Sequence, residues 1–127
     1  MRKFRILVVD DEKDITTVMK MGLEREGFEV DAFNDPLKAL EIFKGSTYDL
    51  VLIDIKMMPI NGFELYRRML EFDNKVRICF MTAFEVYQDE FRMLFPTVSV
   101  DCFVRKPVTI DKLAKIISAQ LVDVKAK

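Results

Sequence analysis

Five short apolar segments, alternating with helix-like segments, are the sequence feature that most constrains the fold. The apolar segments are residues 4–9, 29–33, 50–53, 77–81 and 101–104. Those at 6–9, 50–53 and 78–81 have almost unbroken apolar cores, as strands covered on both faces do. Strand–helix alternation repeated five times predicts a parallel sheet with helices on both faces and right-handed crossovers. We therefore expect an α/β fold.

The stretches between the strands carry the periodicity and the end signals of helices. Residues 15, 18, 19, 22 and 23 share one face of the first predicted helix, and 87, 91 and 94 share one face of the fourth. Asp35 followed by Pro36 is typical of a helix start, and Gly27 and Gly45 are plausible helix stops. No Pro-, Gly- or Ser-rich linker interrupts this pattern, so we expect one domain over residues 1–127.

Composition excludes several classes of function. The chain has no histidine, which excludes a histidine general base, a Ser-His-Asp triad and a histidine phosphocarrier. A net charge of −1 and the lack of a basic stretch disfavour direct binding of nucleic acid. The basic start is followed by too short an apolar run for a secretion signal, and no segment approaches a membrane span.

The two cysteines, Cys79 and Cys102, lie inside apolar runs and are too few for a disulfide framework. We expect them to be small buried hydrophobic residues. A reducing, cytoplasmic setting is the corresponding expectation.

Polar residues follow four of the five predicted strands. Asp10 and Asp11 follow the first, Asp54 the third and Lys106 the fifth, while Thr82 ends the fourth. The second strand lacks such a residue, which fits an edge position and the strand order 2-1-3-4-5. In such a sheet ligands bind outside the carboxyl ends of the strands, where the strand order reverses. We expect these five side chains to lie around one site.

The residue types at this edge favour phosphoryl chemistry. Carboxylates crowded at one rim repel one another and suit Mg²⁺, which prefers oxygen ligands. Asp54 ends a buried strand and is the best candidate to accept a phosphoryl group as an acyl phosphate. Thr82 and Lys106 would stabilise charge on the phosphoryl oxygens. Taken singly, each of these residues is also typical of an ordinary helix cap, turn or loop entry.

Together these motifs resemble the receiver domain of two-component response regulators, including the single-domain chemotaxis regulator. The resemblance spans nearly the whole chain and implies a flavodoxin-like, doubly wound (βα)5 sandwich. It rests on residues 6–12, residues 49–54, Asn61-Gly62, Met81-Thr82-Ala83 and Lys106-Pro107.

The resemblance implies a role for each site residue. Asp54 would be phosphorylated by the phosphohistidine of a sensor histidine kinase or phosphotransfer protein. Mg²⁺ would be bound by Asp11, Asp54 and the backbone carbonyl of Lys56, with Asp10 acting through water. Thr82 and Lys106 would contact the phosphoryl group, and the Lys106–Pro107 bond would be cis.

The resemblance also implies a switch. Phosphorylation would draw the Thr82 hydroxyl inward, and Phe103 on the fifth strand would follow it. The face formed by the fourth helix, the fifth strand and the fifth helix would then bind a downstream protein. The chain would be a monomer or a weak phosphorylation-dependent dimer, without membrane or nucleic-acid partners, and would catalyse no reaction beyond its own phosphorylation and dephosphorylation.

Two other functions remain open at this point. One is a binding module with the same fold that works independently of phosphorylation, against which the intact set of polar residues argues. The other is a Mg²⁺-dependent phosphatase with an aspartyl intermediate. Such enzymes typically need a second Asp two residues after the nucleophile, where this chain has Lys56.

Overall fold

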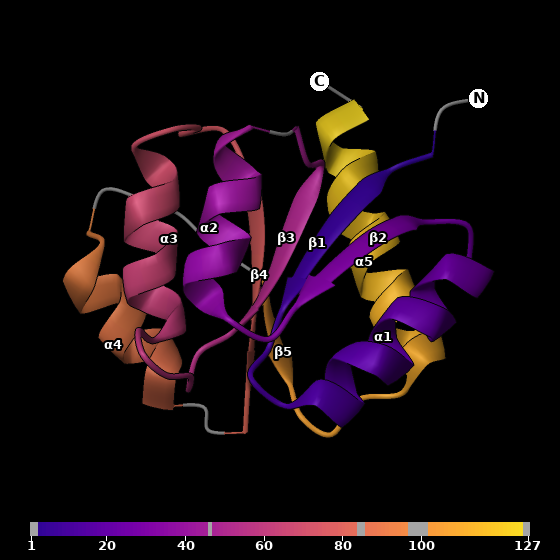
Figure 1. The fold of residues 1–127 in the computed structure, drawn as a ribbon, viewed down its shortest axis with the longest axis horizontal. Helices are drawn as coiled ribbons and strands as arrows, with labels where there is room; N and C mark the ends of the chain where they lie inside the picture. Colours follow the sequence, from indigo (N-terminus) through magenta and orange to yellow (C-terminus); the bar gives the residue numbers. More distant parts are fainter. Residues whose placement is uncertain (1–2, 46, 84–85, 97–101, 126–127) are drawn as a thin grey trace.

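A five-stranded parallel sheet forms the centre of the computed structural model, which describes residues 3–45, 47–83, 86–96 and 102–125 (Figure 1). The strand order is β2-β1-β3-β4-β5, as predicted. The strands are β1 (Arg5–Val9), β2 (Glu29–Phe33), β3 (Leu50–Asp54), β4 (Arg77–Thr82) and β5 (Phe103–Arg105). The predicted fifth strand began at Asp101, which lies outside the described residues.

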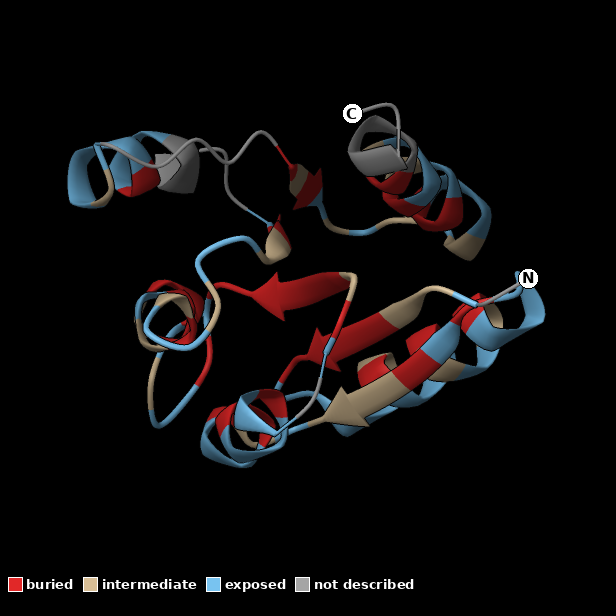
Figure 2. Cartoon of the chain, turned by 90° about the horizontal axis from the view of Figure 1, so that it is seen from above, coloured by how far each residue is buried: buried red, intermediate tan, exposed pale blue. Residues whose placement is uncertain are grey.

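Helices cover both faces of the sheet (Figures 1 and 2). They are α1 (Lys13–Arg25), α2 (Pro36–Lys44), α3 (Gly62–Leu70), α4 (Val86–Leu94) and α5 (Ile110–Lys125). One buried apolar cluster lies between the sheet and α1 and α5, and a second lies between the sheet and α2, α3 and α4. The structure is therefore the predicted flavodoxin-like doubly wound sandwich.

The buried strands supply both clusters, which explains their unbroken apolar sequences. Leu7 and Val9 of β1 belong to the α2–α4 side, whereas Ile6 and Val8 belong to the α1/α5 side. Successive side chains of a strand point to opposite faces, so a strand covered on both sides needs apolar residues at every position.

Three residues predicted on apolar helix faces are exposed, among them Ile42, which was predicted to share a face of the second helix with Ala39 and Phe43. Val18 on α1 is 59% exposed and Leu94 on α4 is 57% exposed. On α1 the buried residues are Thr16, Met19 and Leu23. Thr16 tolerates burial because its hydroxyl donates to the Lys13 carbonyl and accepts from the Asn34 amide.

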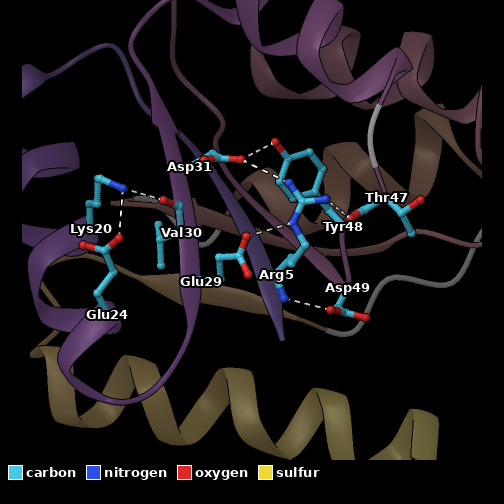
Figure 3. Close-up of polar contacts among 9 residues, drawn as sticks. All are labelled: Arg5, Lys20, Glu24, Glu29, Val30, Asp31, Thr47, Tyr48 and Asp49. Carbon is cyan, nitrogen blue, oxygen red and sulfur yellow. Dashed lines mark hydrogen bonds and ion pairs between the residues drawn. The ribbon is translucent and has the colours of Figure 1, made fainter. Parts of the chain in front are cut away.

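Polar contacts join the amino ends of the first three strands (Figure 3). The backbone N–H of Arg5 donates to Asp49, and its guanidinium contacts Glu29 and Asp31, each at 3.5 Å. The Tyr48 hydroxyl donates to Asp31 at 2.6 Å, and its ring lies under the Arg5 guanidinium. These contacts tie edge strand β2 to β1 and β3 at the end of the sheet opposite the polar residues predicted to form the site.

The expectation of two unpaired cysteines is wrong. Cys79 and Cys102 are both buried, as expected, but they form a disulfide with a Cα–Cα distance of 4.6 Å. The two residues precede Phe80 and Phe103, which are paired across β4 and β5. The register of β4 against β5 places the two cysteines side by side. This register could not be predicted from the two apolar segments, because each was identified separately.

A close approach at Gly62 fixes the backbone behind Asp54. The N–H of Gly62 donates to the Ile55 carbonyl at 2.7 Å, and a Cβ at Gly62 would lie 2.6 Å from the Asp54 carbonyl oxygen. The Asn61 side chain caps α3 by accepting from the Glu64 N–H. The start of α3 therefore presses directly against the end of β3, and only glycine leaves room for this contact.

We expect Gly62→Ala to destabilise the protein by about 1–3 kcal/mol, because the added methyl group meets backbone atoms that must shift. Urea unfolding followed by circular dichroism measures the change. Gly45→Ala is the matched control, since a Cβ at Gly45 meets nothing within 4 Å. Equal stabilities of the two variants would contradict this account of the contact.

Candidate functional site

The predicted polar residues meet at the carboxyl ends of the strands, along the lower edge of the sheet in Figure 1. Asp10 directly follows β1, Asp54 ends β3, Thr82 ends β4 and Lys106 directly follows β5. Asp10, Asp54 and Thr82 are buried, and Lys106 is partly buried. Because all strands are parallel, residues far apart in sequence share one rim.

Lys106 contacts two carboxylates at once. Its Nζ donates to Asp10 Oδ2 at 2.8 Å and lies 3.5 Å from Asp54 Oδ1. The other Asp10 oxygen, Oδ1, accepts from the backbone N–H of Glu12 at 3.0 Å. The side chains of Asp54 and Lys106 are only 9% and 17% exposed, so water screens these charges weakly.

The pKa values of Asp54 and Lys106 reflect this shared environment. Burial and the charge of Asp10 raise the pKa of Asp54 to about 6, although Lys106 partly offsets the effect. Burial lowers the pKa of the Lys106 ammonium, but its hydrogen bond to Asp10 and the charge of Asp54 outweigh burial, so that pKa is raised overall. Asp54 thus lies in a site with too little positive charge for its carboxylates.

The donor set at this rim fits a divalent cation. Carboxylate oxygens of Asp10, Asp11 and Glu12 lie within 4.8 Å of one another, and the charges of Asp10 and Asp11 both raise the pKa of Asp54. These are hard oxygen donors, and their excess negative charge suits Mg²⁺. Glu12 was not among the predicted ligands. Lys56 lies two residues beyond Asp54 with its side chain exposed, and its role as a carbonyl ligand stays a prediction.

Thr82 and Lys106 are joined through the backbone. The Lys106 N–H donates to the Thr82 carbonyl at 2.9 Å, and the Ile55 N–H donates to the Met81 carbonyl at 3.1 Å. These bonds extend the β3–β4–β5 ladder up to the site. The Lys106–Pro107 peptide bond is cis, as is the Met58–Pro59 bond.

Phe103 lies in a cluster of aromatic rings on the α2–α4 side of the sheet. Its ring centroid is 5.6 Å from that of Phe80 and 5.8 Å from that of Phe91. Phe91 of α4 is the centre of the cluster, with ring centroids within 6.0 Å at Phe63, Tyr66, Phe80, Phe95 and Phe103. The helical periodicity predicted that Phe91 faces the core but not that it contacts Phe103.

An apolar groove of about 570 Å³ lies beside Lys106, between α1 and the loop that follows β5. Val18, which the sequence placed with the core, lines this groove. The apolar side chains along it are Ile15, Val18, Met19, Ala83, Pro107, Val108 and Ile110, and the charged ones are Asp14 and Lys106.

Fold and site together define a flavodoxin-like α/β protein with an acidic site at the carboxyl edge of its sheet. The family model described as the response regulator receiver domain matches residues 6–118. The chain therefore belongs to the response regulator receiver family of two-component signalling.

Named relatives agree with this assignment. The uncharacterized transcriptional regulatory protein YkoG of Bacillus subtilis is 31% identical over 95% of this chain and 52% of its own length. Sporulation initiation phosphotransferase F of the same species is 34% identical over 63% of this chain and 64% of its own length. This chain spans about half or less of the length of the transcriptional regulatory proteins it matches.

A solved structure has the same fold over the full chain. The CheY-like receiver domain protein from Methanospirillum hungatei JF-1 superposes with a TM-score of 0.88 at 25% identity, covering 98% of both chains. In the described part of this chain, no helix has both the length and the apolar character needed to cross a membrane.

Asp54 should make stability depend on pH in the absence of metal. The pKa of Asp54 is about 6 in the folded protein, compared with an ordinary value of 3.8. The folded protein therefore binds a proton at Asp54 more tightly than the unfolded chain does. Stability should fall as pH rises from about 4 to 6, and Asp54→Asn should remove this loss. We expect the variant's advantage to grow by about 2 kcal/mol between pH 4 and pH 7.

The measurement is urea unfolding of both proteins in EDTA across this pH range. Taking the difference between the two proteins cancels the titration of groups that do not interact with Asp54 and isolates the titration of the site. Parallel stability profiles would contradict the raised pKa.

Proposed function

We propose that this protein is a phosphorylation-activated switch in which Asp54 accepts a phosphoryl group. The observation that carries the proposal is the Asp54 carboxylate, held at the end of a buried strand with Lys106 3.5 Å away and Asp10 and Asp11 near enough to raise its pKa. Membership of the receiver family supports the same function.

In the proposed reaction an Asp54 carboxylate oxygen attacks the phosphorus of a phosphohistidine on a donor protein. The new O–P bond replaces the N–P bond, and the donor imidazole leaves. The Lys106 ammonium, already beside Asp54 Oδ1, would stabilise negative charge on the phosphoryl oxygens, and the Thr82 hydroxyl at the end of β4 would donate a hydrogen bond to one of them.

Magnesium, when bound, would supply the positive charge that the rim lacks. We propose Asp11, Asp54 and the Lys56 carbonyl as its protein ligands, with Asp10 acting through water. The buried Asp10 is oriented by Glu12 and Lys106, so its carboxylate would hold a water with little loss of side-chain freedom.

Acetyl phosphate with Mg²⁺ should add one phosphoryl group to the wild-type chain, and hydroxylamine should remove it, as expected for an acyl phosphate. Asp54→Asn should remain unmodified because an amide is not a nucleophile here. Intact-mass spectrometry measures both. An unmodified wild-type chain would instead support a phosphorylation-independent binding module.

The groove beside Lys106 is the proposed docking place for the phosphoryl donor, a sensor histidine kinase or phosphotransfer protein. Its apolar lining suits a helix with an apolar face, and its position brings a docked histidine toward Asp54. Receiver homologues support a donor of this class. We infer that this exchange takes place in the cytoplasm.

Val18→Glu should slow phosphoryl transfer from a protein donor at least tenfold, because a charge in the groove must be desolvated on docking. Transfer from acetyl phosphate should be unchanged. The donors are histidine kinases autophosphorylated with a radiolabelled phosphoryl group. The rate at which the label moves from each kinase to this chain is measured. Thr17→Glu, exposed on the same helix but outside the groove lining, is the matched control. Equal loss in both variants would contradict docking in the groove.

We propose that the output passes through Thr82 and Phe103 to the face formed by α4, β5 and α5. Phe103 already packs on Phe91 of α4, so a change in the position of its ring would move that helix. The changed face would control a downstream protein, with the chain itself a monomer or a weak phosphorylation-dependent dimer. No turnover of an external substrate is part of this function.

A further inference from the structure

The Cys79–Cys102 disulfide links β4, which ends in Thr82, to the residue that precedes β5, the strand that Lys106 follows. We propose that these cysteines are a reversible redox pair, and that their bond favours the conformation in which the Phe103 ring packs against Phe80 and Phe91. The inference rests on the proposed function for its link to phosphorylation, but the link between the bond and the aromatic packing stands on the structure alone.

The sheet accommodates the pair in either redox state. The two Cα atoms are 4.6 Å apart, close to the spacing of about 4.8 Å between neighbouring strands in any sheet. The Phe80 N–H donates to the Cys102 carbonyl at 2.9 Å, a ladder bond that does not depend on the sulfur atoms. Both side chains belong to a large apolar cluster, in which cysteine thiols are also well accommodated. Reduction therefore leaves the fold in place.

The disulfide is attached at the start of the shortest strand that the structure describes. β5 has three residues and lies at the edge of the sheet, beside β4. With the thiols reduced, ladder hydrogen bonds and side-chain packing hold β5, and such short edge strands open locally at low cost. With the disulfide formed, the start of β5 is covalently fixed to β4.

This fixed point is adjacent to the aromatic contact. Cys79 and Cys102 directly precede Phe80 and Phe103, whose ring centroids lie 5.6 Å apart. The disulfide side chains point to the α1/α5 cluster, whereas Phe80 and Phe103 point to the opposite cluster. Restraining the backbone at the cysteines therefore restrains the rings on the other face.

The redox step is an ordinary thiol–disulfide exchange. The two thiols lose two protons and two electrons to a low-molecular-weight disulfide, which leaves as two thiols, and a dithiol reductant reverses the reaction. Both cysteines are buried, so exchange requires local opening of edge strand β5. In the proposed switch, phosphorylation draws the partly buried Phe103 ring further inward toward Phe80 and Phe91. That conformation therefore stabilises the disulfide, and the disulfide stabilises that conformation by the same factor.

The test is a redox titration of the full chain in mixtures of oxidised and reduced dithiothreitol. Alkylation and intact-mass spectrometry give the disulfide fraction. Adding beryllium fluoride and Mg²⁺, which mimic a phosphoryl group on Asp54, should shift the dithiol–disulfide equilibrium at least threefold toward the disulfide. Asp54→Asn should show no shift. An unchanged or opposite shift, with binding of the mimic verified by fluorine NMR, would overturn the link to phosphorylation and leave the proposed function intact.

A second arm needs no ligand and separates the two proposals. Phe91→Leu weakens the packing around Phe103 and should shift the equilibrium at least threefold toward the dithiol. Phe72→Leu, at an exposed aromatic residue beyond α3, should leave it unchanged. If the mimic fails to bind, the proposed function fails, and this arm still decides whether the bond and the aromatic packing are coupled. Equal midpoints for both variants and the wild type would overturn that coupling.

Discussion

The contact of one ammonium group with two buried carboxylates organises this end of the molecule. Lys106 holds Asp10 and Asp54 together although the three residues come from different strands of the sheet. Removing the charge of one of these three side chains leaves the opposite charge unpaired and poorly hydrated, which lowers the stability of the folded protein. The single positive charge of Lys106 nevertheless does not balance the negative charges of the carboxylates. The pKa of Asp54 is raised partly for this reason. A site of this kind is suited to cations and to groups whose charge changes.

The sheet topology explains why this site was predictable. In a parallel sheet each strand delivers its last residue to the same edge, so the positions of Asp10, Asp54, Thr82 and Lys106 after apolar runs were enough to predict that they meet. The strand order followed from the same residues, because the second run ends without a polar residue of this kind. Local sequence therefore carried most of the fold and the placement of the site.

What sequence could not supply was the register between strands and the rotation of helices. The Cys79–Cys102 bond depends on which residues of β4 and β5 are opposite each other, a property of the assembled sheet. The exposure of Val18 depends on the rotation of α1 about its axis. Thr16 is buried in place of Val18, which hydrophobic periodicity does not predict, because the Thr16 hydroxyl makes two hydrogen bonds. The central place of Phe91 likewise arises from three-dimensional packing.

The sheet also divides the interior into two separate apolar compartments. The groove beside Lys106 belongs to the side covered by α1 and α5, whereas the aromatic rings around Phe91 belong to the side covered by α2, α3 and α4. Substitutions that adapt one compartment to a new neighbour need not disturb the packing of the other. The donor contacts that we propose for the groove can therefore change without altering the aromatic packing around Phe91.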